Sequence, residues 1–229
     1  ITQHLLTFAK GGEPVKEASL LGELIEESCK FCLHGSNVKC DITIAEDLLP
    51  VEIDRGQVNQ VINNLIINAK QAMPEGGVIK VRTENSTVSA EDNLPIKPGK
   101  YVFITVKDYG VGIPEEDLQK VFDPYFTTKD TGSGLGLASS YSVIQKHGGH
   151  ISVTSEPGVG TTFNIYMPAS KRGSVVSKVV DEKIPELTEG RVLVMDDEES
   201  LRDVATDILT VIGYTVKTAT AGSEAVRYD

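Results

Sequence analysis

The sequence predicts a chain of the α/β class. Segments whose apolar residues recur at helical spacing, such as 55–73, are interspersed with segments that have the pattern of β-strands, such as 78–85. Between residues 64 and 163, four short motifs rich in glycine or asparagine lie at or near the expected edges of these elements. After residue 189, a fully apolar strand ends abruptly in four acidic residues. Helices and strands mixed in this way along a chain are typical of α/β folds.

The first half of the chain contains the expected elements in regular succession. Residues 1–9 are expected to be the last turns of a helix, because Gly11 and Gly12 follow them and glycines end helices. Asp54 is a suitable N-cap for the longest helix, which must stop before Pro74. The elements expected here are a helix at 19–33, strands at 40–45 and 51–53, a helix at 55–73 and a strand at 78–85.

The second half continues this pattern and then changes in composition. Pro114 is expected in the first turn of a short helix, and Gly148 and Gly149 end a longer one. Residues 169–189 are rich in lysine, serine, valine and glutamate without periodicity, and we expect them to form a linker. The other elements expected here are a strand at 101–108, a helix at 135–147, a hairpin of HISVTSE (150–156) and GTTFNIYMP (160–168), a strand at 191–195, a helix at about 200–212 and a strand at 214–219.

Composition excludes several classes of function. The chain has 229 residues, a net charge of −11, 40% hydrophobic and 24% charged residues, which is ordinary for a soluble protein of one or two domains. The negative charge opposes non-specific binding to nucleic acid or to anionic membranes. No apolar run approaches the roughly 18 residues that a transmembrane helix needs, and no signal peptide is present. We therefore expect a cytoplasmic chain without a nucleic-acid partner. The start at Ile1 indicates a fragment, whose membrane anchor, if the whole protein has one, would lie upstream.

Three cysteines, Cys29, Cys32 and Cys40, leave two interpretations open. Cys29-x-x-Cys32, with His34 nearby, resembles one half of a zinc site. Structural zinc sites normally use two spaced pairs of ligands, however, and the spacing here is irregular. The interpretation that we favour is that the cysteines are small apolar residues around a helix that ends near Gly35. An odd number of cysteines also indicates reduced thiols.

Helix 55–73 carries two neighbouring stripes of side chains. The apolar stripe, which we expect to be buried, consists of Val58, Val61, Leu65, Ala69 and Ala72. The stripe beside it consists of the neutral amides Gln60, Asn64, Asn68 and Gln71. An ordinary solvent-exposed face would carry lysine and glutamate instead. An amide oxygen can coordinate Mg²⁺, and an amide NH₂ group can donate to phosphate, without adding charge to an anionic ligand. The alternative is that these amides only hydrogen-bond a neighbouring loop.

The motif DYGVGIP places an acid, Asp108, at the end of a strand and directly before a glycine-rich turn. Gly110 and Gly112 allow a tight turn and a close approach of the backbone. The carboxylate can then face a pocket and accept a hydrogen bond from the amino group of adenine. The alternative is an aspartate that only forms the turn, and the presence of the other motifs argues against it.

The motif GSGLGL brings Gly132, Gly134 and Gly136 to the start of a helix. Their N–H groups and the helix N-terminus form a cradle for an anion such as phosphate. Lys129 is the only basic residue in the segment 127–134 and is the candidate for a further phosphate contact. The alternative for Lys129 is an ordinary solvated surface lysine.

In this order, the motifs resemble those of the ATP-binding catalytic domain of sensor histidine kinases, which belongs to the ATPase superfamily of DNA gyrase and the mismatch-repair ATPases. NLIINAKQAM (from Asn64), DYGVGIP, GSGLGL and GVGTTF (from Gly158) are similar to the N, G1, G2 and G3 boxes, and FDPYFTTK (from Phe122) resembles the F box. The resemblance implies a Bergerat-type α/β sandwich over residues 13–168, in which a mixed sheet has its helices on one face. It also implies that residues 1–12 end a dimerisation helix and that 127–134 form a short ATP lid.

The resemblance further assigns roles to individual residues. It implies that Asn68 holds the Mg²⁺ ion that accompanies ATP and that Asn64 lies near the phosphates. It makes Asp108 the residue that recognises adenine, assisted through water by Thr161. The complete expected ATP site consists of Asn64, Asn68, Gln71, Asp108, Gly110, Gly112, Ile113, Phe126, Lys129, Gly132, Gly134, Leu135, Gly136, Leu137 and Thr161.

Residues 190–229 resemble the N-terminal part of a response-regulator receiver domain, a partial doubly wound βαβ segment. In such folds an apolar parallel strand delivers acids to its C-terminal edge, where the site lies. The resemblance implies that Asp197 binds Mg²⁺ directly and that Asp196 does so through water. We expect this receiver to be truncated before the aspartate that accepts the phosphoryl group. The alternative is a strand followed by an acidic helix N-terminus.

The resemblance implies a histidine kinase of a bacterial two-component phosphorelay, which transfers the γ-phosphoryl group of Mg-ATP to a histidine. The acceptor is expected upstream, because His4 lacks the acid that follows the histidine of the family's H box, and His147 and His150 lie away from the motifs. The fragment alone is therefore not expected to phosphorylate itself. The expected partners of the whole protein are ATP, its own dimerisation domain within a homodimer, and a receiver domain in cis or a response regulator in trans.

Two other functions remain open at this point. A gyrase-type ATPase would hydrolyse ATP, but such enzymes place a glutamate general base one turn before the metal-binding asparagine, where this chain has Asn64. A degenerate scaffold would bind ATP without catalysis, and the complete set of motifs argues against it.

Overall fold

The structure, a computed structural model, describes residues 13–92, 94–129, 132–170, 190–196 and 213–220, together with Arg202, Ala205, Thr206, Leu209 and Thr210. They belong to two compact units, Ile1–Val175 and Val176–Asp229. The helix end expected at residues 1–12 lies outside the described residues, as does most of the linker expected at 169–189.

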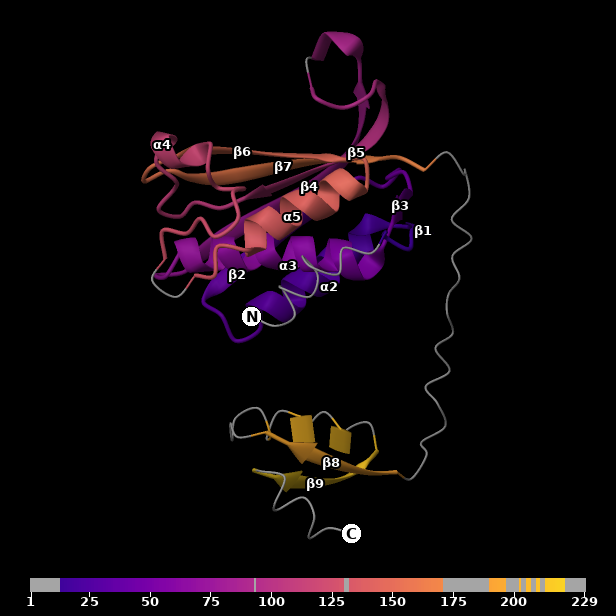
Figure 1. The fold of residues 1–229 in the computed structure, drawn as a ribbon, viewed down its shortest axis with the longest axis vertical. Coiled ribbons are helices and arrows are strands. Elements are labelled where there is room, and N and C mark those ends of the chain that lie inside the picture. The colour runs from indigo at the N-terminus through magenta and orange to yellow at the C-terminus, as the bar shows by residue number, and fades with distance from the viewer. Residues whose placement is uncertain are drawn as a thin grey trace. The chain divides into compact units, whose positions relative to one another are not determined.

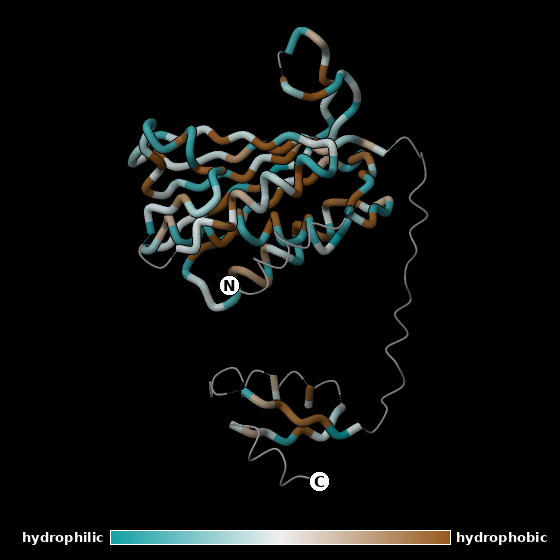
Figure 2. The backbone as a smooth tube through the Cα atoms, in the orientation of Figure 1, coloured by the Kyte–Doolittle hydropathy of each residue, from teal (hydrophilic) through white to brown (hydrophobic). Residues whose placement is uncertain are grey.

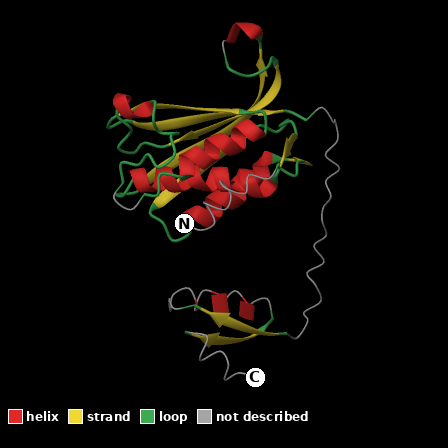
Figure 3. Ribbon diagram, viewed as in Figure 1, coloured by secondary structure: helices red, strands yellow, loops and turns green. Residues whose placement is uncertain are grey.

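The first unit is built on a five-stranded sheet with the strand order β2-β4-β5-β7-β6. Its strands are β2 (Val38–Ile44), β4 (Gly77–Val88), β5 (Gly99–Lys107), β6 (His150–Glu156) and β7 (Gly160–Pro168). The edge strand β2 runs parallel to β4, with Val38 opposite Gly77, and every other neighbouring pair is antiparallel. The sheet is therefore mixed (Figure 3).

Three helices, α2 (Leu21–Leu33), α3 (Arg55–Ala72) and α5 (Gly136–Lys146), cover one face of this sheet (Figure 1). A short helix α4 (Glu115–Leu118) and a 3₁₀ turn (Ala90–Asp92) lie in connections. The strands β1 (Glu17–Ser19) and β3 (Val51–Ile53) form a separate antiparallel pair. The arrangement confirms the predicted α/β fold with a mixed sheet and helices on one face.

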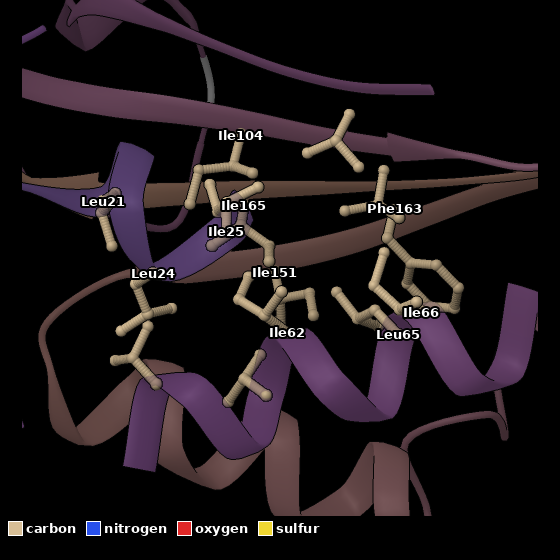
Figure 4. Close-up of a cluster of buried hydrophobic side chains, with 14 of the residues drawn as sticks. Leu21, Leu24, Ile25, Ile62, Leu65, Ile66, Ile104, Ile151, Phe163 and Ile165 are labelled. Atoms are coloured by element: carbon tan, nitrogen blue, oxygen red, sulfur yellow. The ribbon is translucent and has the colours of Figure 1, made fainter. Parts of the chain in front are cut away.

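The core lies between the helices and the sheet, where hydrophobic residues of both layers meet (Figure 2). In Figure 4, Leu24 of α2 and Ile62 of α3 lie opposite side chains of the strands, such as Ile104 and Ile165. Complete burial of one such side chain contributes about 1.5–3 kcal/mol. The apolar stripe predicted on α3 is confirmed by the burial of Val58, Val61, Leu65 and Ala69, while Ala72 at its end is half-buried.

The N-terminus of α3 is fixed as its sequence predicts. The side chain of Asp54 accepts a hydrogen bond from the N–H of Gln57 at 3.1 Å, which satisfies one of the free donors of the first turn. The predicted helix at 19–33 begins two residues late, at Leu21, because Ser19 pairs with Val51 in β1 and β3. The strand β1 was not predicted. Strand β4 continues beyond the predicted residue 85 to Val88, opposite Gly99 of β5.

The first residues of the expected linker are attached to the first unit. The N–H of Ala169 donates to the carbonyl oxygen of Lys100 at 3.0 Å, and the N–H of Ser170 donates to that of Pro50 at 2.7 Å. The first bond continues the pairing of β7 with β5, and the second joins the chain to the residue before β3.

The second unit contains a parallel pair of strands, β8 (Arg191–Met195) and β9 (Thr215–Ala219), with Arg191 opposite Thr215. Between the strands, the described residues from Arg202 to Thr210 are helical, as the strand–helix–strand pattern predicts. Asp196 follows β8, and its N–H donates to the carbonyl oxygen of Ala219 at 3.2 Å. Asp197 lies outside the described residues. Among the described residues of both units, no helix is long and apolar enough to cross a membrane.

Candidate functional site

The amide stripe of α3 joins this helix to the start of α5. Asn64 is half-buried, and its Nδ2 atom donates to the carbonyl oxygen of Gly136 at 3.1 Å and to Oγ of Ser140 at 3.3 Å. These bonds hold the glycine-rich N-terminus of α5 against α3. The amide of Asn64 is thereby oriented by two partners on α5.

The next amides along the stripe converge on a cation. The ammonium group of Lys129 donates to Oδ1 of Asn68 at 3.0 Å and to Oε1 of Gln71 at 2.6 Å. Loss of water around this ammonium lowers its pKa, while the nearby carboxylate of Asp108 acts in the opposite direction. Neutral carbonyl oxygens are the kind of ligand that Mg²⁺ accepts. The two oxygens therefore fit a cation, and the lysine ammonium stands where a metal ion could be held.

Asp108 lies directly after β5, and only 3% of it is exposed. Its Oδ1 atom accepts hydrogen bonds from the N–H of Gly110 at 2.9 Å and from the N–H of Thr161 at 3.2 Å. Burial raises the pKa of this carboxyl, and the two backbone donors and Lys129 oppose the rise. No described residue donates a hydrogen bond to Oδ2. This oxygen is the free acceptor of the group.

The turn after Asp108 packs against the C-terminus of α3. The N–H of Val111 donates to the carbonyl oxygen of Ala72 at 3.1 Å. A Cβ atom on Gly110 would lie 2.5 Å from that same oxygen, which is closer than any side chain tolerates. Gly112 has a φ of +73° and would collide with the backbone of Glu156 if it carried a side chain. The two glycines are therefore required by space and by backbone conformation.

Ser155 on β6 is a site residue that the sequence did not reveal. Its hydroxyl donates to the carbonyl oxygen of Gly160 at 2.9 Å and accepts from the N–H of Ile113 at 2.8 Å. The hydroxyl of Thr161 lies 2.9 Å away, and because the proton of Ser155 is directed to Gly160, Thr161 is the donor of this pair. Ser155 thus ties the turn after Asp108 to the start of β7.

The segment before α5 is held by backbone contacts. The N–H of Tyr125 donates to the carbonyl oxygen of Gly134 at 2.9 Å, and both residues have a positive φ. Leu135 is buried, and Leu137 packs on the core, so their side chains serve packing. Phe126 is half-buried and Gly132 is exposed. Residues 130 and 131 of the expected lid lie outside the described part of the chain.

The cysteines are arranged differently from a zinc site. Sγ of Cys32 donates to Oδ1 of Asn63 on α3 at 3.2 Å, whereas Cys29 lies beside Cys40. Within the described ranges, no three His, Cys, Asp or Glu side chains form a group that could hold a metal ion. The zinc pattern read from Cys29-x-x-Cys32 therefore finds no support in the part of the chain that is described.

Comparisons with known proteins agree on one family. The model of the family "Histidine kinase-, DNA gyrase B-, and HSP90-like ATPase" matches residues 53–171. Among curated proteins, the sensor kinase CckA of Brucella abortus is 39% identical over 208 residues, which cover 85% of this chain and 22% of that protein. Sporulation kinase E of Bacillus subtilis is 39% identical over 133 residues, covering 58% of this chain and 16% of that protein. The chain therefore spans less than a quarter of the length of these two relatives.

Solved structures show the same fold. The catalytic domain of the histidine kinase ThkA is 32% identical, with a TM-score of 0.56, and the match covers 67% of this chain and 95% of that domain. The mycobacterial sensor histidine kinase MprB is 29% identical, with a TM-score of 0.55, and the match covers 68% of this chain and 98% of that one. Full-length ShkA, crystallised in complex with AMPPNP, is 18% identical, with a TM-score of 0.62, over 98% of this chain and 46% of that one. At that identity the likeness to ShkA concerns the fold alone.

Proposed function

Because the chain belongs to the family of histidine kinase-, DNA gyrase B- and HSP90-like ATPases, we propose that it binds Mg-ATP and serves as the catalytic domain of a histidine kinase. The chain is homologous to sensor kinases, and its first unit has the fold of their ATP-binding domain. The proposed reaction transfers the γ-phosphoryl group of ATP to the imidazole of a histidine in a dimerisation domain. ATP, this acceptor and a homodimeric whole protein are parts of the proposal.

The observation that carries the proposal is the convergence of Asn68 and Gln71 on one cation. Two uncharged oxygens, from consecutive turns of one helix, both accept from the ammonium of Lys129. The oxygens lie on the same helix as Ala72, against which the turn after Asp108 packs. The cation position and the buried carboxylate therefore belong to one assembly.

Each part of this assembly has a defined role. Asn68, with Gln71 beside it, would hold Mg²⁺, which supplies neutralisation of the charge on the phosphates. The free Oδ2 atom of Asp108 would accept from the amino group of adenine, and Thr161 would assist through water. The N–H groups at the start of α5 and the ammonium of Lys129 would then face the phosphate chain. Phosphoryl transfer needs mainly positioning and charge stabilisation, which these groups can provide.

Hydrolysis by this site is not favoured. The position one turn before Asn68 is occupied by Asn64, whose NH₂ group is engaged by Gly136 and Ser140. An amide cannot take a proton from water at neutral pH, so the site lacks a general base there. The relatives reported above are kinases and not gyrase-type ATPases.

For the second unit, we propose the N-terminal part of a receiver domain in a bacterial phosphorelay. The parallel pairing of β8 and β9, with helical residues between them, supports a βαβ segment. Asp196 lies directly after β8, at the edge where such folds bind ligands. Asp196 and Asp197 would there contribute to a Mg²⁺ site of a receiver that acts in cis, or a response regulator would accept the phosphoryl group in trans. The proposed location of the whole assembly is the cytoplasm.

The deciding experiment uses ATP labelled on the γ-phosphate. A longer protein that includes the H box, the segment with the acceptor histidine, should acquire acid-labile phosphate on that histidine. Asn68→Ala in this longer protein should abolish the label. The matched control is Gln145→Ala, which removes an exposed amide from α5 and should leave labelling unchanged. Release of inorganic phosphate without labelling of the protein would instead identify an ATPase, and full labelling of the Asn68→Ala protein would refute the metal role.

A further inference from the structure

Two cysteines from different elements meet at the junction of α2 and β2. Cys29 lies on α2 and Cys40 lies on β2, and their sulfur atoms are 3.2 Å apart, with Cys40 donating. Both are free thiols. The structure thus holds two reduced thiols at hydrogen-bonding distance, outside the nucleotide site.

The two thiols differ in their access to solvent. Cys29 is 3% exposed and belongs to the hydrophobic core. Cys40 is half-buried on β2, which is an edge strand of the sheet. Cys40 also packs against the hydrophobic core, but unlike Cys29 it keeps part of its surface in contact with solvent. Cys40 is therefore the partly accessible thiol of the pair, and Cys29 is the buried one.

The hydrogen bond between the sulfurs also separates their acidities. Once Cys40 loses its proton, Cys29 becomes the donor, and this bond lowers the pKa of Cys40, which burial opposes. The same bond raises the pKa of Cys29, and burial raises it further. The half-buried Cys40 is thus the thiol that ionises first, and the buried Cys29 stays protonated. A partly accessible thiolate next to a second thiol is the arrangement typical of oxidation-sensitive cysteines.

We infer that Cys29 and Cys40 form a reversible disulfide when the protein meets a hydroperoxide. In the first step the thiolate of Cys40 attacks the peroxide oxygen, the O–O bond breaks, and the sulfenic acid of Cys40 and an alkoxide or hydroxide ion are formed. In the second step Cys29, on losing its proton, attacks the sulfur of Cys40, and the hydroxyl group leaves and takes up that proton to become water. The two cysteines lose two electrons, and the peroxide gains them.

Cys32 does not take part, although it lies one turn after Cys29. Its thiol donates to Asn63 on α3, and burial raises its pKa, which the nearby ammonium of Lys70 opposes. Cys29 and Cys32 also lie on the same helix, whereas Cys29 and Cys40 come from two different elements. The pair is therefore defined by tertiary structure and not by the Cys-x-x-Cys spacing.

The disulfide would join α2 to β2 covalently. Its sulfurs would lie about 2.05 Å apart, so the two sulfur atoms must approach each other from their present distance of 3.2 Å. Helix α2 is hydrogen-bonded to α3, because Oγ of Ser28 donates to Oδ1 of Asn59 at 2.6 Å. Oxidation would thus link β2 covalently to α2, which hydrogen-bonds the helix that bears Asn68.

The test is the oxidation of the whole chain with hydrogen peroxide, followed by alkylation of the remaining thiols and peptide mass mapping. We expect one disulfide, Cys29 to Cys40, with alkylated Cys32, and full reversal by dithiothreitol. In Cys29→Ala, Cys40 should accumulate as a sulfenic acid that a carbon-nucleophile probe traps. In Cys40→Ala, neither product should form at Cys29.

The matched control is Cys32→Ala, in which the disulfide should form at the rate of the unchanged chain. A circular dichroism melt of each variant verifies that it is folded before oxidation. A disulfide between Cys29 and Cys32, slower formation in Cys32→Ala, or oxidation of Cys40 without pairing in the unchanged chain would each overturn the inference. The readout is covalent mass, so it stands or falls independently of nucleotide binding.

Discussion

The backbone N–H of Asp54 donates to Nε2 of His147 at 3.0 Å, across 93 residues of sequence. Asp54 caps α3, and His147 follows the last turn of α5, where its Nδ1 atom is bonded to the carbonyl oxygen of Val143 at 2.8 Å. Nδ1 therefore carries the proton and donates to Val143, while Nε2 accepts from Asp54. The imidazole ring of His147 is neutral when it makes both hydrogen bonds. This contact fixes the start of α3 against the end of α5.

Protonation of His147 should destabilise the fold. Burial lowers the pKa of His147, although its bond to Val143 and the charge of Asp54 act against this. As the pH falls, the unfolded chain therefore binds a proton at this histidine before the folded chain does. The free energy of unfolding should decrease from about pH 6.5, the ordinary pKa of imidazole, down to the lowered pKa of His147 in the folded chain. Urea unfolding at about pH 7.5 and about pH 5.5 measures the change, since these values bracket that ordinary pKa.

His147→Leu isolates this contribution, because leucine neither accepts a hydrogen bond nor titrates. We expect the free energy of unfolding near neutral pH to fall by about 1–3 kcal/mol, the cost of an unpaired donor at Asp54. The dependence of stability on pH should also become weaker. His150, whose pKa burial also lowers, is present in both proteins, so its contribution cancels. His34→Gln, at an exposed position, should behave as the unchanged chain, and an equal pH dependence in His147→Leu would refute the assignment.

Asp108→Asn should reduce discrimination between ATP and GTP. Asparagine can keep an oxygen for the N–H groups of Gly110 and Thr161, but it replaces the free carboxylate oxygen with a donor. A hydrogen bond to a charged group contributes about 1.5–3 kcal/mol, so the preference should fall about 10- to 100-fold. Titration calorimetry with both nucleotides measures it. Asp41→Asn, which removes a charge from an exposed position on β2, should retain the preference.

Gly110→Ala should weaken nucleotide binding by displacing the turn after Asp108. The added Cβ atom would lie 2.6 Å from Cβ of Ala72 and would break the hydrogen bond from Val111 to Ala72. Overpacking of this kind costs about 1–3 kcal/mol. Gly56→Ala is the matched control, since its Cβ atom would lie 3.5 Å from the nearest atom, Oδ1 of Asp54, within the first turn of α3. That variant should be more stable by about 0.5–1 kcal/mol. Equal nucleotide affinity in the two variants would show that the turn does not shape the site.

Ser155→Ala should lower nucleotide affinity with only a small loss of global stability. The N–H of Ile113 would lose its acceptor, at a cost of about 1–3 kcal/mol confined to the loop. Thermal melting and ATP titration separate the two effects. Ser152→Ala on the same strand is the control, because no described residue hydrogen-bonds the side chain of Ser152. A loss of stability without a loss of affinity would mean that Ser155 supports the strand and not the loop.

Local signals made parts of this structure predictable. Helix α3 was expected to within one residue, because the cap at Asp54 and the stop before Pro74 act on neighbouring backbone groups. The glycines after Asp108 were expected for a similar reason, since a tight turn imposes its own backbone angles. The mixed sheet followed from the resemblance carried by the motifs.

Contacts between distant segments were not predictable. Strand β1 has three residues and no alternating pattern, and it exists because Ser19 meets Val51. Ser155 carries no motif, and its importance comes from partners 5 to 42 residues away. The contact of Lys129 with Asn68 spans 61 residues and depends on the fold of the intervening sheet, whereas its contact with phosphate stays a prediction.

The hydrogen bond from Val111 to Ala72 attaches the turn after Asp108 to the C-terminus of α3, so this helix limits the length of ligand that fits. The helix rises about 1.5 Å per residue, and Asn68 stands about one turn before its C-terminus, which carries the turn after Asp108. In the proposed complex, the separation between the adenine site and the phosphate site would be set by this helix and not by a loop. A nucleotide bound as proposed would be selected by its length. A nucleoside monophosphate would occupy the adenine site, but it would place no phosphate beside the cation that the amides of α3 hold.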